Sequence, residues 1–156
     1  MFKKTISLEF STEIDVDTHT LFAFQTDTHN LPKITPPWID VEIVSLELPL
    51  QKGSRIELDI KRFGLTQKWN MMIFELTSPD LVCDKALKSP FKSFMHYHRF
   101  ESIGKGKSIL KDEVLFSLPL YPFSLVSLPF IKKEMKKMFD YRHQETKKLL
   151  EKKQVI

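Results

Sequence analysis

His96, His98 and Asp112 are the side chains whose types and spacing most clearly point to chemistry. The two histidines lie two residues apart in an alternating segment, and side chains at that spacing on a strand share a face. If this strand pairs with the next one about the turn at residues 103–107, His98 lies opposite Asp112. Both would then point into an aromatic and aliphatic surface, where polar groups are costly to bury unless they satisfy each other or meet a ligand. We therefore predict a hydrogen bond between His98 and Asp112, directly or through one water.

Three roles are open to these residues. In an enzyme, His98 and Asp112 would be the acid and base of a cyclisation or dehydration, assisted by His96. Two histidines on one face could also hold a metal ion, but a third ligand is needed, and only Asp112 or Asp84 is available. We predict neither metal nor cofactor and assign no catalytic residue. A structural or ligand-orienting pair is favoured, because the sequence has no nucleophile motif and no phosphate-binding glycine loop.

Alternating apolar residues separated by turn residues predict an antiparallel sheet of seven strands. The predicted strands span residues 2–11, 39–48, 54–63, 66–76, 81–87, 92–102 and 108–118. The inward face of segment 66–76 is ambiguous, because both of its faces are apolar. A short helix capped by Asp17 or Thr18 should follow the first strand, and residues 30–37 should form a turn-rich connection that can include one helical turn.

After Pro122 the apolar residues recur at intervals of three and four, which predicts a long amphipathic helix from about residues 124–129 to 150–153. The side chains expected on its inner side are Leu128, Ile131, Met135, Met138, Phe139 and Arg142. The lysines expected to flank or oppose that side are Lys132, Lys133, Lys136, Lys137, Lys147 and Lys148. A helix covering the dry face of such a sheet implies an α+β two-layer domain with an apolar gap at one end.

Composition sets the outer limits. A chain of 156 residues is expected to form one domain over residues 1–156, and its thirteen Phe and six Met suit a core or an apolar cavity wall. A single cysteine, Cys83, excludes an internal disulfide, and no run approaches the ~20 apolar residues of a membrane span, so we expect a cytoplasmic protein. Residues 120–156 hold nine basic and four acidic residues, a net +5. This excess suits either a solvated helix face or a weak contact with an anionic membrane surface; no nucleic-acid partner is predicted.

The order of these elements and several short segments resemble the helix-grip superfamily, the START-like and polyketide-cyclase-like domains known as SRPBCC. The matching segments are the opening strand, 21–24 with 30–32, Gly53, Trp69, Asp84, 90–91, 96–100, 112–114, Pro119 and 138–142. They span nearly the whole chain, with a departure at Ser89, where relatives often carry glycine. The resemblance implies a helix-grip fold: a strand, two short helices, then six strands, in a curved seven-stranded antiparallel sheet wrapped around a long C-terminal helix and a hydrophobic cavity.

Members of this superfamily bind lipids, sterols, polyketides or quinones, and a minority are enzymes. We therefore expect a carrier or sensor that binds such a hydrophobic small molecule. A cyclase or dehydratase using His98 and Asp112 is the alternative, and a protein-interaction or chaperone-cofactor module is the second alternative. The oligomeric state and the identity of the ligand stay open. The expected cavity wall consists of Trp69, Met71, Phe94, His96, His98, Phe100, Leu110, Asp112, Val114, Phe116, Met135, Met138, Phe139 and Arg142.

Overall fold

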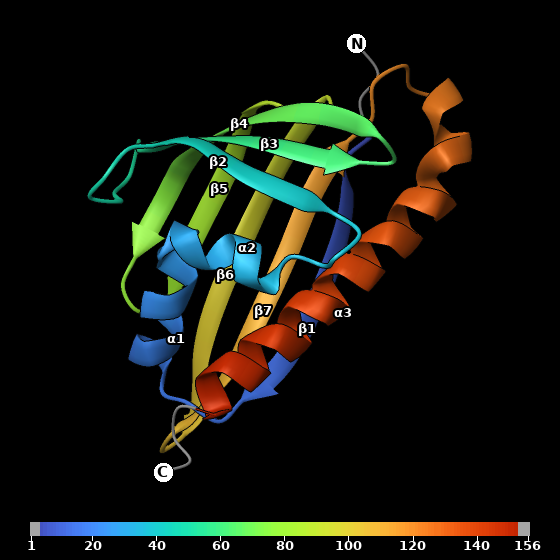
Figure 1. The fold of residues 1–156 in the computed structure, drawn as a ribbon. Coiled ribbons are helices and arrows are strands. Elements are labelled where there is room, and N and C mark those ends of the chain that lie inside the picture. The colour runs from blue at the N-terminus through green and yellow to red at the C-terminus, as the bar shows by residue number, and fades with distance from the viewer. Residues whose placement is uncertain (1–3, 153–156) are drawn as a thin grey trace.

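A seven-stranded antiparallel sheet curves around one long helix (Figure 1). The computed structural model describes residues 4–152. The strands are β1 (Ile6–Ile14), β2 (Asp40–Leu46), β3 (Arg55–Arg62), β4 (Leu65–Thr77), β5 (Leu81–Lys88), β6 (Ser93–Gly104) and β7 (Lys107–Ser117). They lie in the order β1-β7-β6-β5-β4-β3-β2, so the first strand pairs with the last and the others follow the chain in hairpins. The predicted fold is confirmed. The part of the first predicted strand before residue 4 lies outside the described residues.

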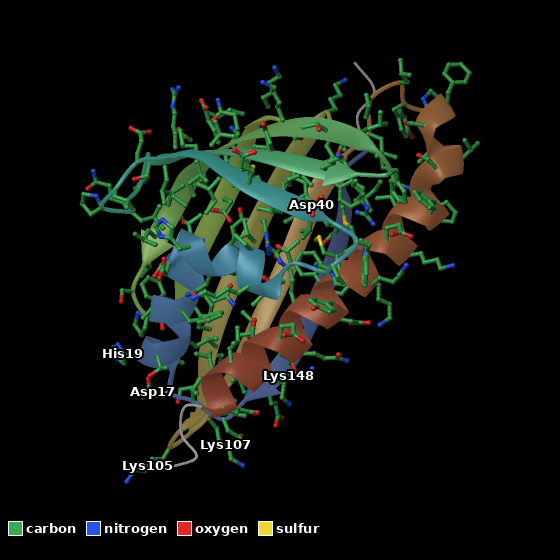
Figure 2. The ribbon with its side chains drawn as sticks, viewed as in Figure 1. Asp17, His19, Asp40, Lys105, Lys107 and Lys148 are labelled. Carbon is green, nitrogen blue, oxygen red and sulfur yellow. The ribbon has the colours of Figure 1, made fainter. Side chains whose placement is uncertain are left out.

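Short helical segments follow β1 and precede the long helix. They are α1 (Thr18–Thr26), the 3₁₀ turns η1 (Thr28–Asn30) and η2 (Phe123–Ser127), and α2 (Leu31–Ile34), while α3 spans Leu128–Lys152. Of the two residues predicted to cap α1, Asp17 does so: its side chain accepts a hydrogen bond of 2.7 Å from the Thr20 N–H at the start of the helix (Figure 2). No helix within residues 4–152 is long and apolar enough to cross a membrane.

α3 runs diagonally across the concave face of the sheet, beside β1, while α1 contacts β6 and β7 farther along (Figure 1). The six apolar or long side chains predicted for the inner side of α3 are all buried or half-buried. Five of the six predicted outer lysines are exposed, including Lys148 (Figure 2), and Lys147 is half-buried. The 3.6-residue period therefore places the amphipathic face correctly.

A β-bulge settles the facing of β4, which the sequence leaves ambiguous. Met71 and Ile73 are buried, and the register with β5 shifts between Ile73 and Glu75. The extra residue turns Phe74 outward, with 42% of its surface exposed, and returns Leu76 to the core. The bulge thus explains why apolar residues occupy both alternating sets of positions along this strand.

The apolar core has two parts. The first, beneath α1 and α2, is built around Ile14, Leu21 and Ile73. The second lies between α3 and the paired strands β1 and β7, where Phe139 stacks on Phe10 with ring centroids 4.7 Å apart. Residues of both parts, among them Met71 and Met135, line the cavity described next.

Candidate functional site: a cavity with a buried polar network

A cavity of about 570 Å³ lies between the sheet, α2 and the N-terminal half of α3. This volume falls within the roughly 300–1,000 Å³ of small-molecule sites. Its wall is mainly apolar, from the inward faces of β3 and β4, from the segment after α2, and from α3. The inward alternation of Ile56, Leu58 and Ile60 on β3 was visible in the sequence, although these residues were not among the predicted wall residues.

Nine of the fourteen predicted wall residues line this cavity. They are Trp69, Met71, Phe94, His96, His98, Met135, Met138, Phe139 and Arg142. The other five do not reach it: Phe100, Leu110, Asp112, Val114 and Phe116 are buried in packed structure instead. The strand parity was correct, but elements packed on the sheet cover these positions. For example, the Phe22 ring of α1 packs edge-on against the Phe100 ring, with the ring centroids 5.7 Å apart.

Three histidines and two aspartates form a polar network in and behind the cavity wall. Asp84 lies on β5, His96 and His98 on β6, Asp112 on β7, and His143 on α3. Asp112 Oδ1 accepts a hydrogen bond from His96 Nε2 at 2.7 Å, and its Oδ2 accepts one from His143 Nε2 at 2.6 Å. His98 donates through Nε2 to Asp84 Oδ2, also at 2.7 Å. The network therefore ties α3 to three neighbouring strands.

The predicted pairing of His98 with Asp112 is correct in register but not in hydrogen bonding. The two residues are Cα partners in the β6–β7 ladder, and His98 Nδ1 lies 3.2 Å from Asp112 Oδ1. This contact is an ion pair without hydrogen-bond geometry, since Nδ1 has no hydrogen-bond partner. Of the hydrogen bond that we predicted between them, direct or through one water, the direct form is not present; the hydrogen bonds that Asp112 accepts come from His96 and His143.

Sequence reasoning missed two members of the network as partners. His143 follows Phe139 by four residues and therefore shares the inner stripe of α3, a signal that the helical period contained. Asp84 shares the inward face of β5 with the buried Val82. From the sequence we considered it only as one of the segments that resemble the helix-grip superfamily and as an available metal ligand.

Burial and charge separate the protonation states of the two stacked histidines, whose ring centroids are 3.7 Å apart. Burial, followed by the positive charge of His98, lowers the pKa of His96 to about 4. Burial also opposes the charge of His98, but its contacts with Asp112 and Asp84 outweigh this and raise its pKa to about 9. Near pH 7, His98 is therefore an imidazolium and His96 is neutral.

Both carboxyl groups of the network stay ionised. Burial alone would raise the pKa of Asp112, but hydrogen bonds from His143 and His96 hold it well below its ordinary value. Burial opposes the ionised form of Asp84 too, and the hydrogen bond from His98 more than compensates, so its pKa is lowered.

The hydrogen bond that His96 forms with the ionised carboxylate of Asp112 fixes the tautomer of the His96 ring. The proton must lie on Nε2, which leaves a lone pair on Nδ1. Among the described residues Nδ1 finds no hydrogen-bond partner, and the ring lines the cavity. His96 can therefore accept a hydrogen bond from a ligand, whereas His98 is held between two carboxylates.

A metal ion suits this arrangement poorly. Asp84, His96 and His98 each offer a ligand atom, all within 4.8 Å of one another. However, the two imidazole rings are stacked with an angle of 29° between their planes, so their lone pairs do not converge on one point. His98 Nε2 is also committed to Asp84. The cluster is better described as a hydrogen-bonded network.

Two arginines contribute to the cavity wall. Arg62, at the end of β3, forms an ion pair with Glu134 of α3, and both residues line the cavity. Arg142 extends from α3, and its guanidinium carbon lies 5.6 Å from the centroid of the Phe139 ring. Burial lowers the pKa of Arg142, and the negative charges of Asp112 and Asp84 offset this in part.

Neither a protein-family model nor a curated protein sequence matches the chain. Solved structures match its fold throughout. A START superfamily protein from Mycobacterium smegmatis aligns with a TM-score of 0.72 and 13% identity, covering 94% of this chain and 97% of that protein. Norcoclaurine synthase from Thalictrum flavum aligns with a TM-score of 0.72 and 11% identity, over 96% and 88%. Major latex-like protein 151 from Panax ginseng gives 0.64 and 17%, over 92% and 95%.

Proposed function

We propose that this protein, which has the START-like helix-grip fold, binds a hydrophobic small molecule in its cavity and acts as a carrier or sensor. The observation that carries this proposal is the cavity of about 570 Å³, whose wall is mainly apolar and includes the polar side chains of Asp84, His96, His98 and Arg142. The matching norcoclaurine synthase structure, solved with dopamine and hydroxybenzaldehyde, supports it as an example of a protein of this fold that holds small organic ligands.

Cavity filling tests this proposal. Ile60 points into the cavity, whereas its neighbour Lys61 is exposed on the other face of β3. Ile60→Trp should weaken binding of Nile red, or of ligands found by native mass spectrometry in protein from its own host, by at least about tenfold, and Lys61→Trp should not. Equal binding by both variants, or no binding of apolar compounds by the unaltered protein, would contradict the proposal.

A group of exposed apolar side chains near the cavity supports a role in transporting the ligand between membranes. We call them the mouth patch: Phe63, Leu65, Leu120, Phe123, Val126 and Phe130. Leu120, Phe123 and Val126 are 82%, 82% and 88% exposed, and the exposed Lys132 and Lys133 follow directly in α3. Such a group suits insertion into a lipid surface, with each lysine contributing about 1 kcal/mol near anionic headgroups. A protein-interaction module would instead present an apolar surface apart from the cavity.

Liposome co-sedimentation tests the membrane contact. Binding should require anionic lipid, weaken with salt, and decrease in Phe123→Glu. Phe74→Glu is the matched control, because Phe74 is exposed on β4 outside the mouth patch. Negligible binding to neutral and anionic vesicles alike at low salt would contradict it. A cytoplasmic location, to which the free and buried thiol of Cys83 is suited, belongs to the same proposal.

An enzymatic role is the second candidate, and the free Nδ1 of His96 is the observation that favours it. His96 would accept a proton from the ligand while Asp112 orients its ring, and His98 would hold Asp112 and Asp84 in place. A pKa of about 4 makes His96 a weak base at neutral pH, which is why we prefer ligand binding and transport to an enzymatic role. In an enzyme, His96→Gln should keep ligand binding but stop conversion of the bound compound, as followed by mass spectrometry.

A further inference from the structure

The charged groups of the cavity wall differ in whether they have a partner. His98 lies between Asp84 and Asp112, and Arg62 is paired with Glu134. Arg142 is different: among the side chains that the structure describes, its guanidinium forms no ion pair and no hydrogen bond. Arg142 lines the cavity, and its guanidinium carbon lies 5.6 Å from the centroid of the Phe139 ring.

A guanidinium in this position lacks acceptors rather than countercharge. It carries five N–H donors, and a desolvated cation is costly unless these donors meet oxygen atoms. The overall charge nearby is already balanced, because Asp84 and Asp112 are negative while His98 and Arg142 are positive. A ligand group that accepts hydrogen bonds would therefore be stabilised next to Arg142.

We propose that Arg142 binds the carboxylate of an amphipathic ligand whose apolar part occupies the cavity. This rests on the proposed function and names the ligand class. A planar carboxylate matches the fork of a guanidinium with two parallel hydrogen bonds. A phosphate monoester fits less well, because its second negative charge would face Asp84 and Asp112, and Arg142 is the one unpaired cation among the described residues of the cavity wall.

Three probes with the same alkyl chain separate the contribution of the headgroup. Dodecanoate, methyl dodecanoate and dodecan-1-ol are compared by displacement of Nile red at pH 7.5. The unaltered protein should bind dodecanoate about tenfold to a hundredfold more tightly than the ester, as expected for a charge-assisted hydrogen-bond pair. Arg142→Gln should lose this preference while binding the ester and the alcohol as before, and Arg142→Lys should keep part of it.

Lys133→Gln is the matched control. It removes one positive charge from the exposed side of the same helix, so it should leave the preference for the acid unchanged. Equal binding of acid and ester by the unaltered protein, or a preference that persists in Arg142→Gln, would overturn the proposal. Failure of all three probes and of Nile red to bind would instead overturn the proposed function on which it rests.

A second measurement needs no variant and therefore does not depend on the folding of Arg142→Gln. The carboxyl group of ¹³C-labelled dodecanoate is titrated by NMR while bound to the unaltered protein. Next to Arg142 it should stay ionised at pH 6, since a neighbouring cation holds the pKa of a carboxyl group at or below its ordinary value. A bound acid that protonates above pH 6 would show burial without a cationic partner and would overturn the assignment.

Discussion

Raising the pH from 6.5 to 9 should remove about 3 kcal/mol of unfolding free energy through His98 alone. In the folded protein, burial disfavours its charge, but the contacts with Asp112 and Asp84 raise its pKa to about 9, against about 6.5 when unfolded. Between these values the folded state binds one proton more than the unfolded state, so stability falls as pH rises. The contribution is complete below pH 6.5 and lost above pH 9. At about 1.4 kcal/mol per pH unit, this interval gives about 3 kcal/mol.

Urea unfolding at a series of pH values, followed by tryptophan fluorescence, measures this loss. With a dependence of about 1–3 kcal/mol per molar urea, the midpoint should fall by roughly 1–3 M between pH 6.5 and 9. Asp84→Asn keeps an oxygen that can accept from His98 but removes one of the two charges, so it should reduce the loss. His19→Gln, at an exposed histidine on α1 (Figure 2), should not change it. A flat stability curve, or an imidazole NMR titration of His98 with a pKa of 6.5 or lower, would refute this reasoning.

Three further predictions follow from single side chains. Burial lowers the pKa of His96 to about 4, so acidification from pH 6.5 to 4 should lower the free energy of unfolding, because His96 binds a proton in the unfolded chain before it does so in the folded protein. His96→Gln should reduce this loss in the same urea series. Phe139→Ala should cost about 3–5 kcal/mol in urea unfolding, because the ring is fully buried between Phe10 and His96. Burial raises the pKa of the Cys83 thiol to about 11, so a disulfide reagent should label it at pH 8 more than about a hundredfold faster in unfolding urea than in buffer.

The sequence predicts the strands and the β6–β7 register well because both depend on short-range rules. Side chains alternate along a strand, and the turn at residues 103–107 limits the pairing, so His98 falls opposite Asp112 as expected. Which atoms form hydrogen bonds depends on side-chain directions and on distant elements. His143 lies 31 residues from Asp112 and reaches it only because α3 crosses β7, which no local pattern specifies.

The five predicted wall residues that do not line the cavity are explained in the same way. Strand parity correctly places Leu110 and Phe116 on the inner face of β7. It does not say where along that face the helices lie, and thus which inward positions are covered and which remain open. Phe116 is packed under α3 and Leu110 in the cluster beneath α1, whereas Trp69 on β4, farther from α3 in the sheet, lines the open space.

The shared carboxylate of Asp112 constrains the order in which this cluster could change over evolution. Replacing Asp112 first would leave three imidazoles around a neutral side chain, and replacing His98 first would leave two buried carboxylates facing each other. Either substitution made first lowers the free energy of unfolding more than the same substitution made after its partner has changed. The effects of the two substitutions on stability should therefore be strongly epistatic. Natural variation here should therefore exchange Asp84, His98 and Asp112 together or retain all three.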